Sequence, residues 1–184
     1  MNVVSTDVPG VLIIEPRLFG DARGFFVETY QSSRYADLGI RRPFVQDNLS
    51  RSSRGVLRGL HLQNPFSQGK LVTVLRGRVL DVCVDVRVGS PTFARHVAVE
   101  LNDENRRQLW VPRGFAHGFL VLSESVDFFY KCDQGYSPQH EVSVRWNDPA
   151  IGIEWGVERP VLSAKDAVAP LLAEVGNLPV YGQV

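Results

Sequence analysis

The sequence predicts an all-β protein, a double-sheet barrel of the jelly-roll (cupin-like) type with a few short helices. Short apolar runs follow one another along the chain, several alternate with polar residues, and Gly, Pro, Asn and Asp separate them. No long amphipathic helix interrupts this succession before about residue 155. Such a pattern is typical of antiparallel barrels and sandwiches. The 184 residues fit one domain, 1–184, large enough to bury a sizeable core.

In the N-terminal part, apolar and aromatic runs predict strands separated by one helix. The strands are expected at 11–14, 24–29 and 44–49, and the helix at 31–38, ended by Gly39. In the third strand Gln46 and Asn48 share one face, and Asp47 lies on the other. Two amide side chains on one face suit hydrogen bonding to a heterocycle, although an ordinary polar surface explains them equally well.

The middle of the chain is the most regular. Residues 70–76 and 78–86 are expected to form a hairpin that turns at Gly77, and 119–122 and 126–132 a second strand pair. A further strand is expected at 96–101, and 113–118 is expected to be a Gly-punctuated turn. Near the C-terminus, Ser163 is expected to cap a short helix with Asp166 at its third position.

Composition excludes several classes of function. Lys plus Arg and Asp plus Glu each number 20, and no dense basic run is present, so nucleic acid is not expected as a partner. No apolar stretch of about 18 residues and no leader-like segment is found, which predicts a cytoplasmic protein without a membrane span. Cys83 and Cys132 are too far apart in sequence for a Cys-built metal site, and a disulfide framework is not expected.

The stretch 58–63 is the strongest candidate for chemistry. Arg58 and His61 emerge from one strand-like run, and Lys70 opens the next strand. One titratable base and two cations at one cavity suit the removal of a proton beside a carbonyl and the stabilisation of the resulting negative charge.

The four histidines divide into two pairs. His96 and His140 have charged neighbours and are interpreted as surface residues. His61 and His117 lie in apolar, Gly-punctuated segments; either alone is more often structural, but two together favour a site. A metal is the rival interpretation, because barrels of this type often use a His-x-His pair. Gln63 stands two positions after His61, so no metal is expected.

Two further side chains have both a structural and a catalytic interpretation. Tyr130 and Tyr136 are most simply packing residues, yet a phenol facing the cavity opposite the base could deliver a proton to an enolate. Asp166 is most simply a helix-cap carboxylate, yet a carboxylate on the far nitrogen of an imidazole would fix its tautomer. The residues alone leave both alternatives open.

Several spaced motifs together resemble one known family. They are 19–28 (FGDARGFFVE), 46–48 (QDN), 56–63 (VLRGLHLQ), 68–71 (QGKL), 111–120 (VPRGFAHGFL), 130–132 (YKC), 136–138 (YSP), 146–155 (WNDPAIGIEW) and 162–166 (LSAKD). Across nearly its whole length the chain resembles the dTDP-4-dehydrorhamnose 3,5-epimerases, cupin-like enzymes of deoxysugar-nucleotide metabolism. The resemblance implies a cofactor-independent isomerase that inverts C3 and C5 next to a C4 ketone, in the biosynthesis of dTDP-L-rhamnose.

The resemblance also implies a role for individual residues. His61 matches the proton-abstracting base, Asp166 its orienting carboxylate, Tyr130 the acid on the other face and Lys70 the group that stabilises charge on the C4 oxygen. Tyr136 is implied to pack on the nucleobase. The other residues implied to bind substrate are Arg23, Phe26, Glu28, Gln46, Asp47, Asn48, Arg58, His117, Glu141 and Lys165. A homodimer is implied, with N-terminal strands completing the neighbouring site.

Two alternatives and one departure accompany the resemblance. Within the enzyme class, relatives invert only C3 or only C5, or move the ketone between C3 and C4, although Tyr130 argues for inversion. In a different class, a non-catalytic sugar-nucleotide binding module could keep the pocket without turnover. The combination of His61, Lys70, Tyr130 and Asp166 weighs against the binding module, because binding alone needs no acid and base. Gln134 and Gly135 replace the bulkier residues that many relatives carry before Tyr136, which leaves selectivity for thymine open.

Overall fold

The computed structural model describes residues 1–184 and confirms the predicted all-β class. No helix has the length and apolar character that crossing a membrane requires. The elements are β1 (Asn2–Ser5), β2 (Leu12–Glu15), β3 (Leu18–Asp21), β4 (Gly24–Val27), α1 (Ser32–Asp37), β5 (Gln46–Ser53), β6 (Leu57–Gln63), β7 (Lys70–Arg76), β8 (Arg78–Asp85), β9 (His96–Asn102), β10 (Gln108–Val111), β11 (Phe115–Val121), β12 (Ser125–Cys132), η1 (Pro138–His140), β13 (Glu141–Ser143), α2 (Ala164–Ala167) and η2 (Leu172–Glu174).

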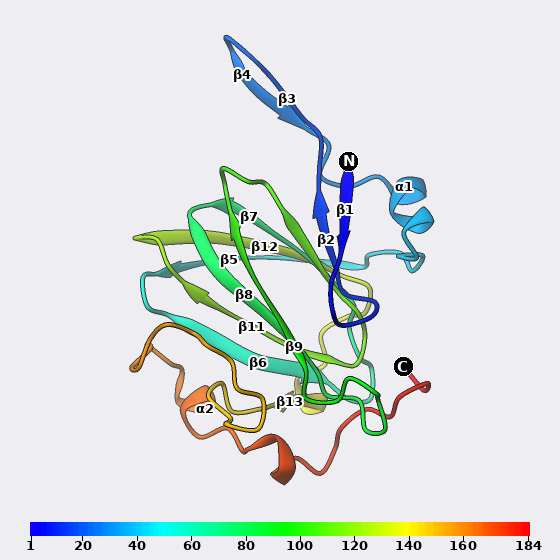
Figure 1. Ribbon diagram of the computed structural model, residues 1–184, viewed down its shortest axis with the longest axis vertical. Helices are drawn as coiled ribbons and strands as arrows, with labels where there is room; N and C mark the ends of the chain where they lie inside the picture. The colour runs from blue at the N-terminus through cyan, green and yellow to red at the C-terminus, as the bar shows by residue number, and fades with distance from the viewer.

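Two antiparallel sheets face each other, as Figure 1 shows. The six-stranded sheet has the order β1-β2-β10-β7-β12-β5, and the five-stranded sheet has the order β13-β6-β11-β8-β9. Strands that are distant in sequence alternate within each sheet, as the jelly-roll prediction requires. The β3–β4 hairpin belongs to neither sheet.

Two predicted strand pairs are wrong. β7 lies between β10 and β12 in the six-stranded sheet, whereas β8 lies between β11 and β9 in the other, so Gly77 connects the two sheets and does not turn a hairpin. β11 and β12 are likewise in different sheets. The segment 113–118 is also less of a turn than expected, because β11 begins at Phe115 and includes His117. Both faces of β8 and β11 are buried, and a strand of that kind needs a partner layer on each side.

The main core fills the space between the two sheets. Fifteen buried residues form it, among them Val72, Leu109 and Phe128 from the six-stranded sheet and Val79 and Phe119 from the five-stranded sheet. The rings of Phe119 and Phe128 stack across the sheets with their centroids 3.8 Å apart. This packing closes one part of the interior and leaves the polar side chains of the same inner faces around a cavity.

The C-terminal segment covers the outer face of the five-stranded sheet. Ile151, Trp155 and Leu172 pack there against Leu57, Val84 and other residues in a second buried cluster of 12. The path of this segment beneath β6 is visible in Figure 1, where α2 lies beside that strand. Burial of this sheet face therefore also delivers α2 to the edge of the interior.

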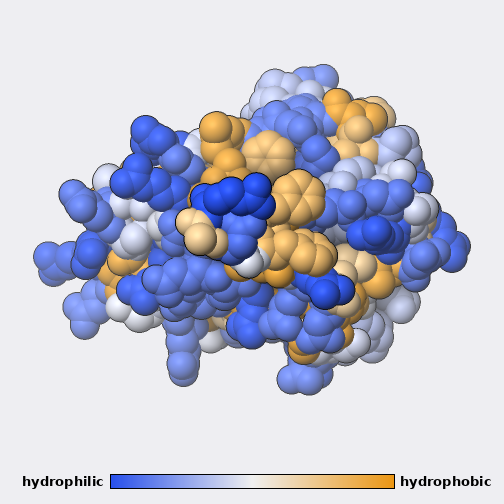
Figure 2. All heavy atoms as spheres, turned by 90° about the horizontal axis from the view of Figure 1, so that it is seen from above, coloured by the Kyte–Doolittle hydropathy of each residue, from blue (hydrophilic) through white to orange (hydrophobic).

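A hairpin of β3 and β4 projects away from the barrel (Figure 1). Its apolar side chains are exposed: Leu18 by 47%, Phe19 by 50%, Phe25 by 54% and Phe26 by 67%. Figure 2 looks down on this end of the molecule and shows hydrophobic side chains gathered in the middle of the face. An exposed apolar cluster of this kind marks a binding surface more often than a free one.

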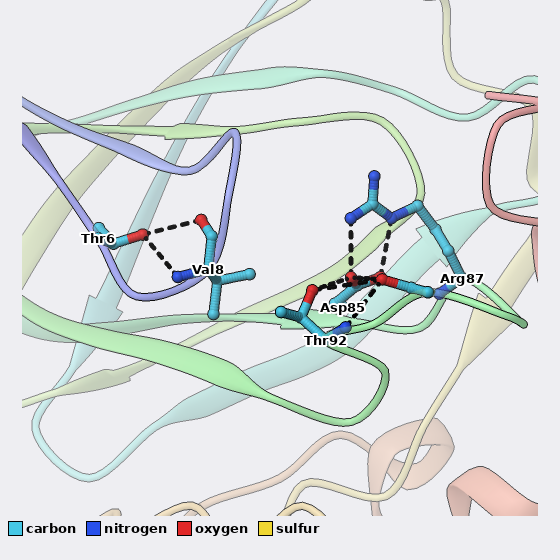
Figure 3. Close-up of polar contacts among 6 residues, drawn as sticks. Thr6, Val8, Asp85, Arg87 and Thr92 are labelled. Carbon is cyan, nitrogen blue, oxygen red and sulfur yellow. Dashed lines mark hydrogen bonds and ion pairs between the residues drawn. The ribbon is translucent and has the colours of Figure 1, made fainter.

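The connection from β8 to β9 is held by a buried carboxylate, shown in Figure 3. Asp85 accepts hydrogen bonds from Arg87 Nε at 2.8 Å, from Thr92 Oγ1 at 2.7 Å and from the Ser90 hydroxyl. Burial acts to raise the pKa of Asp85, but the hydrogen bonds from Arg87, Ser90 and Thr92 outweigh it and lower the pKa. The ionised carboxylate thus fixes this loop at the end of the five-stranded sheet.

A bulge in β6 brings the side chains of Arg58 and His61 to one face. Along the ladder with β11, His61 is opposite His117 and Arg58 is opposite Phe119, so three steps on β6 match two on β11. Residues three apart normally point to opposite faces of a strand. The extra residue reverses that alternation, and Arg58 and His61 both line the same cavity.

The two strands approach each other closely at this bulge because both carry glycine. A Cβ on Gly118 would lie 2.7 Å from the carbonyl oxygen of Arg58. Gly59 has a φ of +127°, and its Cβ would lie 2.6 Å from the Cα of Gly118. Side chains at either position would push the strands apart and move Arg58 and His61.

We expect Gly118→Ala to destabilise the fold by about 1–3 kcal/mol, the usual cost of overpacking. The matched control is Gly176→Ala, since a Cβ there meets no atom within 4 Å and the backbone is not left-handed. Urea unfolding of both variants measures the difference. An unchanged midpoint for Gly118→Ala would contradict the close approach.

Candidate active site

A cavity of about 630 Å³ opens between the two sheets. It receives polar side chains from β6 and β11 on one side and from β7 and β12 on the other. The segment around α2 closes one edge. The lining residues are Ser50, Val56, Leu57, Arg58, His61, Lys70, His117, Gly118, Phe119, Phe128, Tyr130, Val161, Leu162, Ser163, Lys165 and Asp166.

His61 and Asp166 form a hydrogen-bonded pair at the edge of this cavity. His61 Nε2 lies 2.6 Å from Asp166 Oδ1, although the residues are 105 positions apart in the chain. Ser163 caps α2 as predicted, because its hydroxyl accepts a hydrogen bond from the Asp166 amide at 3.1 Å. The carboxylate of Asp166 is therefore available to the imidazole. Of the two alternatives left open by the sequence, the structure favours the orienting one.

The environment of Asp166 keeps its carboxylate ionised. Burial acts to raise its pKa, but the hydrogen bond and charge of His61, together with a hydrogen bond from the Ser163 side chain to the carboxylate, outweigh burial and lower the pKa. An ionised acceptor on Nε2 fixes the imidazole tautomer with that nitrogen protonated. Nδ1 is then the nitrogen that is free to accept a proton.

Two cations lie in the same cavity. Lys70 is at the start of β7 and half-buried, and burial lowers its pKa despite the opposing influence of Cys132, Glu141 and Asp81. Arg58 donates a hydrogen bond from Nε to the Ser52 hydroxyl at 3.1 Å. These charges line the cavity where they could stabilise an anion that forms on a bound molecule.

Tyr130 reaches the cavity from the sheet opposite His61. It lies on β12, and the β12–β7 register pairs Cys132 with Lys70, so Tyr130 and Lys70 share the inner face of the six-stranded sheet. Burial raises the pKa of Tyr130 to about 12, with a further contribution from Cys132. The phenol is consequently protonated at neutral pH and able to donate its proton.

Asp81 is a polar cavity neighbour that sequence reasoning missed. His117 Nε2 lies 2.9 Å from Asp81 Oδ1, and both side chains are buried. The second oxygen, Oδ2, has no hydrogen-bond partner. An acidic residue in the middle of β8, with Leu80 and Val82 on either side, was the available signal, because a buried carboxylate needs a donor. Asp81 orients His117 from the neighbouring strand.

The expected nucleobase residues form a cluster beside the cavity. Gln46 Oε1 accepts a hydrogen bond from the Tyr136 amide at 2.8 Å, and Gln46 Nε2 donates to Asn48 Oδ1 at 3.0 Å. Tyr136 itself is 53% exposed. Asp47 lies on the other face of β5, where its carboxylate pairs with Lys131 Nζ at 2.8 Å. The predicted alternation of faces along this strand is therefore confirmed.

Glu141 and Lys165 lie close to His61. Lys165 Nζ donates to Glu141 Oε1 at 2.8 Å, and the same oxygen lies 4.0 Å from His61 Nδ1. Tyr136 donates its hydroxyl proton to Glu141 Oε2 at 3.1 Å. This network connects the cluster around Gln46 to the imidazole.

Three expected binding residues lie outside the cavity of their own chain. Arg23 and Phe26 are on the projecting hairpin, and the Arg23 side chain is 89% exposed and paired with Asp21. Glu28 follows β4 and pairs with Arg34 Nη1 at 2.6 Å. None of the three lines the space around His61.

Gln63 has a structural task. Its amide nitrogen donates to the Phe66 carbonyl at 2.9 Å, and its Oε1 accepts from the Ser137 amide at 2.8 Å. It thereby fixes the loop that carries Tyr136.

No group of three or more His, Cys, Asp or Glu side chains is arranged to hold a metal ion.

Comparison with known proteins identifies the family. The family model described as dTDP-4-dehydrorhamnose 3,5-epimerase matches residues 5–174. The chain belongs to the dTDP-4-dehydrorhamnose 3,5-epimerase family. A family member from Salmonella typhimurium, named dTDP-4-dehydrorhamnose 3,5-epimerase, is 55% identical over 175 residues, which are 94% of this chain and 96% of that protein. The resemblance stated from the motifs is confirmed.

Solved structures of epimerases share the fold. The dTDP-6-deoxy-D-glucose-3,5-epimerase of Legionella pneumophila, in complex with dTDP-4-keto-L-rhamnose, has a TM-score of 0.95 and 53% identity, and 98% of each chain is covered. A 3′-monoepimerase from Streptomyces bikiniensis, in complex with dTDP-quinovose, has a TM-score of 0.89 and 36% identity over 96% of this chain and 92% of that one. Enzymes that invert one carbon or two therefore use the same barrel.

Proposed function

We propose that the chain, acting as a single catalytic domain over residues 1–184, inverts C3 and C5 of dTDP-4-dehydro-6-deoxy-D-glucose to give dTDP-4-dehydro-L-rhamnose. Membership of the 3,5-epimerase family supports this activity. The observation that carries the mechanism is the placement of His61, oriented by Asp166, in one cavity with Tyr130 and Lys70 from the opposite sheet.

The reaction begins with proton removal beside the ketone. The C4 carbonyl acidifies the hydrogens on both C3 and C5, so one base and one oxyanion site serve both carbons in turn. His61 Nδ1 accepts the proton, and the electron pair moves onto the C4 oxygen as an enolate. Lys70 stabilises that oxygen; a contact of this kind is typically worth about 3–4 kcal/mol in the barrier.

Inversion follows when a proton returns to the other face of the enolate. Tyr130, on the sheet opposite His61, donates it. The tyrosinate is then reprotonated by solvent, and the imidazolium loses its proton likewise. The step needs no redox partner and no electrophilic metal, because the ketone already present in the substrate provides the activation. The proposed enzyme is accordingly independent of a cofactor.

The rest of the substrate would contact both this chain and a second copy. Arg58 and His117 line the cavity as partners for the sugar and diphosphate, and Gln46, Asn48 and Tyr136 lie where the base would bind. Arg23 and Phe26 lie on the hairpin that projects from the barrel, and Glu28 follows it. None of them lines the cavity of its own chain, which supports a homodimer in which they complete the neighbouring site. Light scattering would give twice 20.5 kDa for the dimer, and a monomer mass would contradict it.

The proposed enzyme works in the cytoplasm. Both cysteines, Cys83 and Cys132, are free and buried, which suits a compartment that keeps thiols reduced.

Proton NMR of the wild-type protein with dTDP-4-keto-6-deoxyglucose in deuterated water tests the function. We expect deuterium at both C3 and C5, together with the L-rhamno product, because a single base serves both positions. Exchange and inversion at C3 alone would assign the chain to the monoepimerases, which share its fold at 36% identity. Binding of the sugar nucleotide without any exchange would show that the chain is a sugar-nucleotide binding module and not an enzyme.

A further inference from the structure

His61 lies between two carboxylates, and only one of them is hydrogen-bonded to it. Asp166 holds Nε2 at 2.6 Å, whereas Glu141 Oε1 is 4.0 Å from Nδ1, beyond hydrogen-bond distance. Because Nε2 is occupied by Asp166, Nδ1 is the nitrogen that receives the substrate proton. The fixed negative charge nearest to the reactive nitrogen therefore belongs to Glu141.

The pairing of β13 with β6 places Glu141 near His61. β13 pairs with β6, with Ser143 opposite His61 and Glu141 opposite Gln63. Glu141 and His61 are thus diagonal neighbours on one face of the ladder, within reach of long side chains. Both Glu141 oxygens are held, Oε1 by Lys165 at 2.8 Å and Oε2 by the Tyr136 hydroxyl at 3.1 Å. The carboxylate is fixed at its distance from the imidazole.

Glu141 remains ionised in this position. Burial acts to raise its pKa, but the hydrogen bond from Lys165 and the charge of His61 outweigh burial and lower the pKa. Its side chain is only 20% exposed, so solvent screens the charge less than at the open surface. A negative charge about 4 Å from Nδ1 favours the protonated imidazole.

We propose that Glu141 is a positioning residue for the base, stabilising the imidazolium that forms when His61 takes the substrate proton, and that Lys165 limits this stabilisation by pairing with Glu141. The inference rests on the proposed role of His61. It gives this ion pair a task in proton transfer in addition to the nucleotide contacts expected of both residues.

The titratable and charged groups around His61 come from every neighbouring element. Asp166 and Lys165 are on α2, Glu141 is on β13, Lys70 is on β7, Tyr130 is on β12, His117 is on β11 and Arg58 is on β6 itself. The cations Lys70 and Arg58 disfavour the imidazolium, and Asp166 and Glu141 oppose them. Glu141 and Lys165 are the two members of one ion pair. Removing the negative charge and removing the positive charge should therefore shift the protonation of His61 in opposite directions.

The experiment compares Glu141→Gln with Lys165→Met. In protein labelled with ¹⁵N-histidine and free of substrate, the His61 imidazole is titrated by NMR and assigned by its absence in His61→Asn; only four histidines are present. We expect Glu141→Gln to move the titration midpoint to lower pH, and Lys165→Met to move it to higher pH, each by about half a unit or more. The acid limb of kcat/KM should move in the same two directions.

Controls and outcomes separate this role from simple binding. Glu15→Gln removes a charge of the same type from the Glu15–Arg107 pair, which lies outside the cavity, and should leave the midpoint unchanged. A raised KM with unmoved midpoints, or shifts in one common direction, would overturn the proposal. Lys165 is 49% exposed, so Lys165→Met tests the proposal even if Glu141→Gln does not fold. The titration needs no substrate, so its result can be interpreted even if the epimerase assay shows no activity.

Discussion

His61→Ala is expected to reduce deuterium exchange at both C3 and C5 of the keto sugar by about 10²- to 10⁴-fold, the usual contribution of a positioned acid or base. Alanine leaves no group at this position of the cavity lining that can accept a proton. One base serves both carbons in the proposed mechanism, so the two exchange rates should fall together. Proton NMR in deuterated water measures both rates in one sample.

His96→Ala is the matched control for this substitution. His96 begins β9 and does not line the cavity, so its removal should leave exchange unchanged. Normal exchange in His61→Ala would mean that another group is the base.

Asp166→Asn gives a finer test, because the amide keeps the shape of the Asp166 carboxylate, which lies 2.6 Å from His61 Nε2, but removes its charge. It should lower exchange at both carbons while the fold is kept.

Tyr130→Phe should have its largest effect on inversion. Phenylalanine keeps the ring but removes the proton donor on the sheet opposite His61. His61 can still remove a proton and return it, or a deuteron from solvent, to the same face. We therefore expect exchange to persist in part, while formation of the inverted sugar falls by about 10²-fold or more. Exchange and product stereochemistry are followed in the same NMR experiment.

The control here is Tyr181→Phe, which removes a hydroxyl from an exposed tyrosine in the C-terminal tail and keeps the ring over which Arg87 lies. It should leave both rates unchanged. Equal losses of exchange and inversion in Tyr130→Phe, or no loss of either, would show that the acid is another group. An exchange-to-inversion ratio in Tyr130→Phe equal to that of the wild type would likewise show that Tyr130 is not the acid.

Local features of the barrel were predictable because they depend on neighbours in the chain. The period-2 alternation that places Gln46 and Asn48 on one face of β5 follows from the pleat of a single strand. The Ser163 cap of α2 likewise involves only the next three residues. The residues of 58–70 pointed to His61 and Lys70, and the family resemblance, which rests on short contiguous motifs, supplied the roles of both residues and of Tyr130.

Pairing between distant segments was less accessible. The pattern at Gly77 looked like a hairpin because two apolar strands flank one glycine, a local signal shared by a hairpin and by a connection between sheets. The choice between them depends on which layers cover both faces of β8, and those layers come from the rest of the chain. Hydrophobic burial, which is non-local, therefore selected the partners.

The sequence by itself determined the all-β class and pointed to His61 as the candidate base, because residue type and alternation are properties of short segments. Only the tertiary structure decided how these residues act together. It brought Asp166 to His61 across 105 positions, placed Asp81 beside His117, and used a bulge to direct Arg58 and His61 into one cavity. A buried charge needs a partner, and that partner is set by how the sheets pack and not by separation in the chain.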